Sequence, residues 1–168
     1  MDGGEGHFVA RLRRVGENPC GVGSAPLRPV SRPTLALARE LWEDLFTGEL
    51  PETVEEFGEK LLVLPRELPD PAGLGVLRAG VELALHKGKR LEPCHGAFLA
   101  ARPEHCRRVA DFDPEDPRLG AFLRGEELDW DGEKGYTAVA VRGTVTGFGK
   151  AAGGRLKNHY PKGLRNLR

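Results

Sequence analysis

The sequence is poor in the residue types on which several common functional sites depend. Its only serines, Ser24 and Ser31, lie in or beside a Pro-rich stretch, so a serine triad is not expected. Its three cysteines, Cys20, Cys94 and Cys106, form no even disulfide framework and suit a reducing compartment. No apolar run approaches the roughly 20 residues that span a bilayer, and the start lacks the apolar core of a signal peptide. We therefore expect a cytoplasmic protein with no membrane partner.

Acidic residues are missing from the last part of the chain. Residues 134–168 contain no Asp or Glu, whereas the rest of the chain carries 17 basic residues against 25 acidic ones. Charge asymmetry of this kind indicates a polyanionic partner, most often a nucleic acid. A solvated basic tail is the alternative that composition leaves open. The basic residues of the segment are Lys134, Arg142, Lys150, Arg155, Lys157, Lys162, Arg165 and Arg168.

The basic segment also has the pattern of a small sheet. Two runs of alternating β-formers, 136–142 and 144–150, meet at a glycine, which predicts a hairpin because Gly accepts the positive φ of a tight turn. Gly147 and Gly149 interrupt the second run and indicate a bulge or the close approach of another backbone. A turn and a short strand are expected to follow.

The earlier part of the chain predicts a mixture of helices and short strands. The clearest helix is 31–47, where Leu35, Ala38, Leu41, Trp42, Leu45 and Phe46 recur at helical spacing. The other expected elements are a strand at 7–13, a Pro/Gly-rich linker at 15–33, a helical turn at 53–57, a strand at 60–65, a loop at 67–75, two strands within 76–86, an exposed turn at 86–90, a helix at 92–106, a strand at 108–112 and a helix ending at Gly125.

Two charged stretches have alternative interpretations. The turn at 86–90 groups His86 with Lys87, Lys89 and Arg90, so it is either an exposed hairpin turn or a second loop that contacts phosphates. The acidic tract 126–133, which contains Trp130, would either repel misplaced phosphates or pair with the basic end inside the fold.

The residues 147–165, GFGKAAGGRLKNHYPKGLR, resemble the closing signature of bacterial Sun-type (RsmF-like) RNA cytosine methyltransferases. In that family a small-residue strand ending in Gly-Lys precedes a Leu-Lys-Asn-x-Tyr-Pro-Lys-Gly-Leu-Arg motif, which this chain matches from Leu156 to Arg165. The residues GEGHFVARLRR, from Gly4 to Arg14, resemble the last strand of the family's catalytic domain. The resemblance therefore spans nearly the whole chain.

The resemblance implies an α+β chain in which a small α/β domain is followed by a PUA-like mixed β pseudo-barrel with short helices. Residues 1–32 would be the remnant last strand of a catalytic domain and a Pro/Gly-rich linker, 33–107 the small α/β domain, and 108–168 the PUA-like RNA-binding domain. The implied work is to bind structured RNA (ribosomal RNA, or transfer RNA) and to position a cytosine for an upstream methyltransferase domain. That upstream domain would bind S-adenosylmethionine, and no cofactor is expected in this chain.

The last residues of the motif supply the expected RNA contacts. Asn158 and His159 would form hydrogen bonds with sugar or base edges. Tyr160 would either stack on a base or pack in the core. The basic side chains expected to contact phosphates are Lys150, Arg155, Lys157, Lys162 and Arg165.

No catalytic constellation is expected in this chain. The family's Pro-Cys and Thr-Cys-Ser motifs are absent, and Cys20 follows Pro19 only after the final catalytic-domain strand, so we do not assign it as the nucleophile. The pairs Cys94-His95 and His105-Cys106 lack the CxxC or HxxxH spacing of zinc sites, so we expect buried thiols and surface imidazoles. Two other functions stay open: a module that docks on an acidic protein, and an enzyme that uses the Cys/His pairs.

Overall fold

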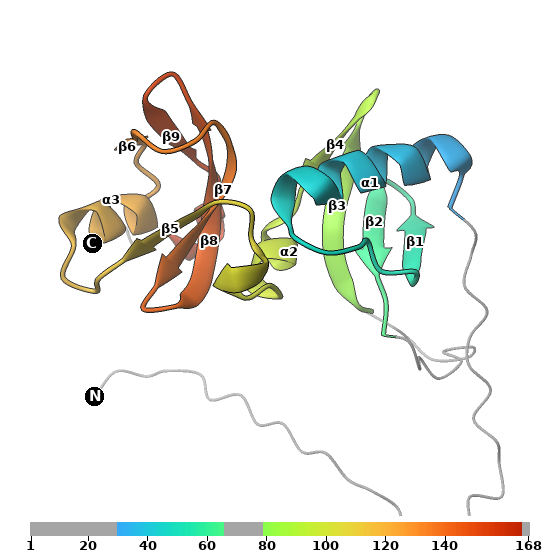
Figure 1. Ribbon diagram of the computed structural model, residues 1–168, viewed down its shortest axis with the longest axis horizontal. Helices are drawn as coiled ribbons and strands as arrows, with labels where there is room; N and C mark the ends of the chain where they lie inside the picture. Colours follow the sequence, from blue (N-terminus) through green and yellow to red (C-terminus); the bar gives the residue numbers. More distant parts are fainter. Residues whose placement is uncertain (1–29, 66–78, 166–168) are drawn as a thin grey trace, which may run out of the picture.

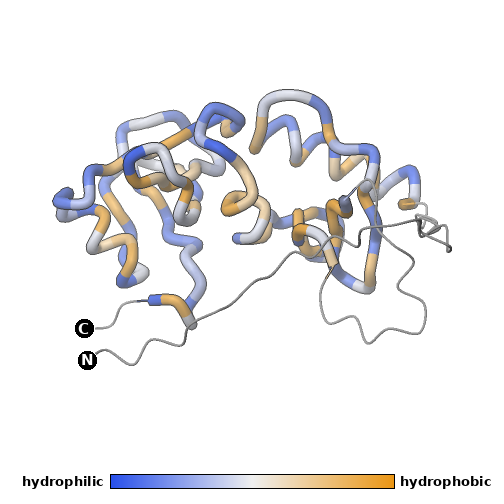
Figure 2. The backbone as a smooth tube through the Cα atoms, turned by 90° about the horizontal axis from the view of Figure 1, so that it is seen from below, coloured by the Kyte–Doolittle hydropathy of each residue, from blue (hydrophilic) through white to orange (hydrophobic). Residues whose placement is uncertain are grey.

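The computed structural model describes residues 30–65 and 79–165, which form two β-sheets and three α-helices (Figure 1). Apolar and polar stretches alternate along the chain in both halves of the molecule, as expected for elements that bury one face each (Figure 2). No helix in these two ranges is long and apolar enough to cross a membrane. The expected strand at 7–13, the loop at 67–75 and nearly all of the linker at 15–33 lie outside the described residues.

The first helix confirms the prediction for 31–47. Helix α1 spans Arg32–Leu45, and the side chain of its N-cap residue, Ser31, accepts a hydrogen bond of 3.2 Å from the backbone N–H of Thr34. Its buried stripe, Thr34, Ala38, Leu41 and Leu45, repeats at helical spacing and faces the first sheet.

The first sheet is an antiparallel meander with the strand order β1-β2-β3-β4, and α1 covers one of its faces (Figure 1). Its strands are β1 (Val54–Phe57), β2 (Lys60–Val63), β3 (Val81–Lys87) and β4 (Arg90–Pro93). The prediction of a helical turn at 53–57 was wrong. That segment pairs residue for residue with β2 across a turn at Gly58, which has φ of 60°. Cross-strand pairing therefore overrode the weak local signal.

Strand β3 corrects the prediction of two strands within 76–86. Residues 79 and 80 precede it, and it runs without a break from Val81 to Lys87. Its register with β2 shifts by one residue at a β-bulge, which leaves Leu83 and Ala84 both buried. Gly80, which suggested a break between two strands, lies just before β3 with φ of 61°, and residues 76–78 lie outside the described residues. The next connection is the exposed hairpin turn predicted at 86–90, with Lys87 paired to Arg90.

The helix predicted over 92–106 was also wrong. Strand β4 runs to Pro93, the helix α2 is confined to His95–Leu99, and a 3₁₀ turn follows at Pro103–His105. The two prolines disfavour a continuous helix because proline lacks an N–H and restricts the residue before it. Helix α2 is short, but it carries the buried side chains of Ala97 and Phe98.

The second sheet is curled and mixed, with the strand order β5-β7-β8-β9-β6. Strand β5 is parallel to β7 and the other pairs are antiparallel. The strands are β5 (Val109–Phe112), β6 (Leu128–Asp129), β7 (Gly135–Val141), β8 (Thr144–Ala152) and β9 (Arg155–Asn158), and a 3₁₀ turn, η2 (Lys162–Leu164), follows. These two sheets and their helices confirm the predicted α+β class, with a curled mixed sheet in the second half.

Helix α3 (Pro117–Arg124) forms as expected between β5 and β6. Asp116 caps its start by accepting a hydrogen bond from the backbone N–H of Arg118, and Gly125 ends it in the left-handed conformation at φ 90°. Leu119 and Phe122 are buried on its inner face, and Leu123 is half-buried.

The β7–β8 hairpin confirms the prediction at 142–144. Arg142 and Gly143 have φ of 46° and 75°, the pattern of a two-residue type I′ turn. The close approach predicted at Gly149 is also present, because a Cβ there would lie 2.8 Å from the side chain of Leu156 and from the carbonyl oxygen of Lys157. Only a glycine fits this position between β7 and β9 without a shift of the neighbouring strand.

Replacing Gly149 with alanine is expected to lower the free energy of unfolding by about 1–3 kcal/mol, since the added methyl group overpacks a site bounded partly by backbone. Urea unfolding of Gly149→Ala measures this loss. Gly163→Ala is the matched control, because a Cβ at Gly163 has no neighbour within 4 Å. Equal unfolding midpoints for the two variants would contradict the close approach.

One hydrophobic cluster joins the two sheets through α2. The ring of Phe98 stacks on Phe148 of β8, with centroids 4.4 Å apart and an interplanar angle of 9°. The same ring lies 5.5 Å from the ring of Phe46 at the end of α1. Ala138 and Val145 of the second sheet belong to this cluster as well. A separate cluster, which includes Phe122 and Leu156, fills the other side of the second sheet.

Candidate nucleic-acid interface

Two lysines of the predicted site lie directly opposite each other on neighbouring strands. In the β8–β9 ladder Lys150 pairs with Lys157, and in the β7–β8 ladder Lys150 pairs with Tyr136. Both lysines are exposed, and neither forms an ion pair within residues 30–65 and 79–165. Like charges in directly opposed positions destabilise a sheet. We call Lys150 and Lys157 the lysine pair, and its uncompensated positive charge can attract an anion.

Tyr136 is a neighbour of the lysine pair that sequence reasoning did not include. The ammonium group of Lys150 lies 4.6 Å from the centroid of the Tyr136 ring, a cation–π contact that holds the lysine side chain along the sheet. The position of Tyr136 follows from strand register, which the sequence pattern alone did not fix.

His159 lies on the same face as the lysine pair, just beyond β9. His159 as a whole is exposed. Its imidazole stacks on the ring of Phe148, with centroids 5.0 Å apart and an interplanar angle of 29°, and meets the ring of Tyr136 edge-on at a centroid distance of 6.1 Å. Burial of the inner part of the ring lowers the pKa of His159 below 6.5, and the nearby charges of Lys157 and Lys150 lower it further, against the opposing charge of Glu92. The imidazole is therefore neutral at neutral pH.

Tyr160 packs into the fold, which is one of the two alternatives predicted for it. Its ring lies 5.5 Å from the buried ring of Phe122 and meets His95 of α2 edge-on at 5.6 Å. Burial lowers the pKa of His95, so this imidazole is also neutral at neutral pH. The Tyr160 ring thus links α3 to α2.

The amide of Asn158 is occupied by the fold. Its Nδ2 donates to the carbonyl oxygens of Phe122 at 2.8 Å and Glu126 at 2.9 Å, and its Oδ1 accepts from the backbone N–H of Tyr160 at 2.7 Å. The two bonds from Nδ2 attach the end of β9 to the C-terminal end of α3, and the bond to Oδ1 fixes the turn that follows β9. The structure therefore gives Asn158 a role in holding the fold together, which the sequence analysis did not predict.

The two predicted arginines are held by partners inside the fold. Arg155 donates to the carboxylate of Glu127 at 3.0 Å and also pairs with Asp129, so the acidic tract pairs with the basic end at this point. The guanidinium of Arg165 donates to the carbonyl oxygen of Tyr160 at 3.3 Å and 3.4 Å. Lys162, in contrast, is exposed in η2 and makes no ion pair with the part of the chain that the structure describes. Three of the five predicted phosphate contacts, Lys150, Lys157 and Lys162, are thus available to a ligand.

In the two Cys/His pairs the Cys106 thiol is buried and the Cys94 thiol is half-buried. Burial, assisted by a nearby carboxylate in each case, raises the pKa of Cys94 and of Cys106 to about 11, so both thiols are protonated at neutral pH. Within the described ranges no three His, Cys, Asp or Glu side chains group as metal ligands would. Neither observation supports an enzyme that uses these pairs.

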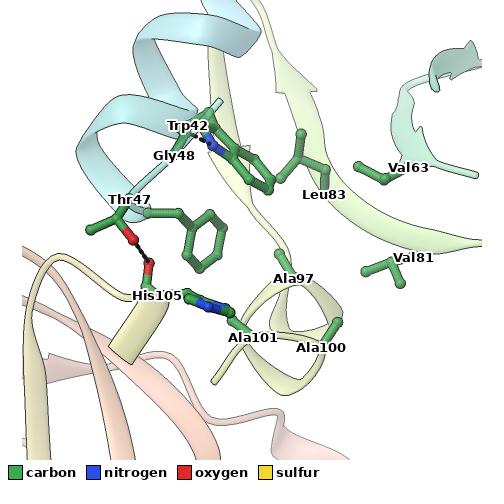
Figure 3. A pocket seen from close by; sticks show the side chains of 11 residues that line it. Trp42, Thr47, Gly48, Val63, Val81, Leu83, Ala97, Ala100, Ala101 and His105 are labelled. Carbon is green, nitrogen blue, oxygen red and sulfur yellow. Dashed lines mark hydrogen bonds between the residues drawn. The ribbon is translucent and has the colours of Figure 1, made fainter. Parts of the chain in front are cut away.

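A pocket of about 400 Å³ opens between α1, β3 and α2, away from the lysine pair (Figure 3). Trp42 and Leu83 are among its apolar walls, and the segment from Ala97 to Ala101 lies on another side. The indole N–H of Trp42 donates to the carbonyl of Gly48 at 3.2 Å, so this polar atom is already satisfied. The apolar lining does not suit a phosphate or a sugar, so the candidate interface is the face of the second sheet that carries the lysine pair.

Comparison with known families assigns each half of the chain in turn. Residues 38–100 match the RsmF rRNA methyltransferase first C-terminal domain, and residues 109–166 match the methyltransferase RsmF PUA domain. The chain belongs to the RsmF family. This confirms the resemblance read from residues 147–165 and places the lysine pair, His159 and Lys162 in the RsmF PUA domain.

Curated RsmF proteins are similar along almost all of the chain. The chain is 29% identical over 169 residues to the ribosomal RNA small subunit methyltransferase F of Aliivibrio fischeri (strain ATCC 700601 / ES114), with 95% of this chain and 35% of the relative covered. It is 28% identical over 173 residues to the protein of the same name from Vibrio atlanticus (strain LGP32), with 95% and 36% covered. The chain thus spans about a third of the length of these relatives.

Proposed function

We propose that this chain is the RNA-binding part of an RsmF-type ribosomal RNA methyltransferase. The observation that carries the proposal is the lysine pair: two exposed, directly opposed and unpaired cations within the region matched by the RsmF PUA domain. A sheet tolerates such a repulsion where a bound phosphate relieves it. Lys162 adds a further exposed cation that forms no ion pair among the described residues of the same domain.

The proposal assigns the chemistry to another part of the protein. In this proposal the chain binds structured RNA and presents a cytosine to an upstream catalytic domain that binds S-adenosylmethionine. The RNA is ribosomal RNA, with transfer RNA as the second candidate. Residues 33–107 would support the RNA-binding domain, 108–168 would contact the RNA, and 1–32 would lead from the catalytic domain. Asn158, Tyr160 and Arg165 act in this proposal by holding the end of β9 in place.

A protein with an acidic surface is the second candidate partner, because the same three lysines would also meet carboxylates. The two candidates differ in their dependence on salt. RNA binding releases condensed counterions, so its affinity falls steeply with salt, by close to one unit of log–log slope for each phosphate contact.

The first test is the binding of structured ribosomal RNA by the full chain across a salt series. The variant Lys150→Ala/Lys157→Ala/Lys162→Ala is expected to bind about 10- to 100-fold more weakly at low salt, with a slope flatter by about 2–3, since three phosphate contacts are lost.

The control variant is Arg102→Ala/Arg124→Ala/Arg142→Ala, which removes the same charge. Each of these arginines already pairs with a carboxylate, Glu104, Glu126 and Asp113 respectively, so the slope should match that of the wild type. Equal losses of RNA affinity in the two variants would show that the effect depends on net charge alone, and would overturn the assigned interface. No binding by the wild type at low salt would favour the acidic protein partner.

A further inference from the structure

Three rings lie near the lysine pair, and they differ in what covers them: Tyr136 and His159 are on its face of the sheet, whereas Tyr160 packs against the cluster on the other side. The Tyr136 ring has the ammonium of Lys150 over it at 4.6 Å. The Tyr160 ring packs against Phe122 and His95 and is half-buried. His159 is the exposed member of the three. A ligand that approaches this face therefore meets the imidazole of His159 first.

The imidazole is held in place from below. It stacks on Phe148, which is 2% exposed, and Phe148 in turn stacks on Phe98, which is 1% exposed. A ring that is fixed at the end of a stack of two buried rings loses little conformational freedom when a further ring stacks on it. The arrangement is thus an ordered platform and not a free surface side chain.

The charges around His159 favour a nucleotide over an apolar ligand. Lys157 is two residues before it, and Lys150 is the cross-strand partner of Lys157. These two cations lie close enough to act on the charge state of the imidazole. An aromatic platform with cations beside it is the combination by which proteins bind unpaired nucleotides, where the base stacks and the phosphates meet lysines.

We propose that His159 is the stacking platform for one unpaired base of the RNA, with Lys150 and Lys157 bound to the flanking phosphates. The inference deepens the proposed function and rests on it: the substrate class becomes RNA that offers a single-stranded base at this face, such as a loop or bulge. The role of His159 is to stack, in place of the hydrogen bond to a sugar or base edge expected from the sequence. A fully paired helix uses only the lysines.

The test compares two RNA probes of equal length, a single-stranded oligomer of mixed sequence and a blunt duplex, with the full chain at one low salt concentration. His159→Ala is expected to bind the single strand about 5- to 100-fold more weakly and to bind the duplex within about 2-fold of the wild type. His159→Phe keeps a ring and should restore binding to the single strand. His159→Gln keeps hydrogen-bonding capacity without a ring and should resemble the alanine variant. His105→Ala, in the apolar pocket, is the control and should change neither affinity.

The outcomes separate this inference from the proposed function. If the wild type binds both probes and His159→Ala binds them as the wild type does, the platform is refuted and the RNA-binding function stands. Recovery by His159→Gln but not by His159→Phe would show a hydrogen bond and overturn stacking. An equal loss for both probes in His159→Ala would show a structural effect and overturn it too. If the wild type binds neither probe, the proposed function fails, and the inference fails with it.

Discussion

Replacing Phe98 with alanine is expected to lower the free energy of unfolding by about 3–5 kcal/mol, the range for truncation of a fully buried aromatic side chain. Phe98 is 1% exposed and contacts both Phe46 and Phe148, so the cavity would lie where the two sheets share one hydrophobic cluster. Urea unfolding followed by tryptophan fluorescence measures the loss. Leu99→Ala is the control, because this next residue is 50% exposed and its truncation should change stability by about 0.5 kcal/mol or less.

The same experiment shows whether the halves unfold together. Trp42 lies in the first half and Trp130 in the second, so Trp42→Phe and Trp130→Phe each leave one reporter. In the wild-type background the two transitions should coincide, and in the Phe98→Ala background they should separate. An unfolding midpoint for Phe98→Ala equal to that of Leu99→Ala would contradict the shared core.

Replacing Asn158 with alanine is expected to lower the free energy of unfolding by about 2–4 kcal/mol. The change removes three hydrogen bonds, each with a net contribution of about 0.5–1.5 kcal/mol, and leaves the carbonyl oxygens of Phe122 and Glu126 without this donor. Thermal and urea unfolding measure the loss. Lys157→Ala, at the exposed preceding position, is the control for stability and should change it little.

The two positions should behave in opposite ways towards RNA. Where Asn158→Ala is still folded, it should keep the low-salt affinity of the wild type, whereas Lys157→Ala should keep its stability and lose affinity. The reverse result, an Asn158→Ala protein of wild-type stability that binds RNA poorly, would restore the direct contact predicted from the sequence.

The sequence predicted the elements whose signals are local. The helix at 31–47 has a cap and a full apolar stripe, the hairpin at 142–144 has a glycine where φ must be positive, and Gly149 sits where a neighbouring strand approaches closely. The wrong predictions concern 53–57, which pairs with β2 across a turn at Gly58, and 92–106, where two prolines disfavour a continuous helix. Hairpin pairing in the first segment and the prolines in the second outweighed the weak helical pattern on which the two predictions relied.

The candidate site was predicted as a set of residues and not as an arrangement. The sequence indicated five cations but did not show which were free, because Arg155 meets Glu127 and Asp129 from a strand 26–28 residues earlier in the chain. Strand register alone places Lys150 opposite Lys157 and beside Tyr136. The distinction between His159 and Tyr160 likewise depends on packing against α2 and α3, which follows from the tertiary fold.

The hydrophobic cluster around Phe98 bears on how such a chain can be divided or recombined. The two family matches meet between residues 100 and 109, which looks like a natural place to separate two modules. If the chain were cut there, α2 would stay with the first half. The second half would then expose Ala138, Val145 and Phe148, which α2 covers in the intact chain. A transplanted RNA-binding half would therefore need to bring α2 with it or find a substitute. The border between the two family matches therefore differs from the border of a hydrophobic core that could fold without the other half.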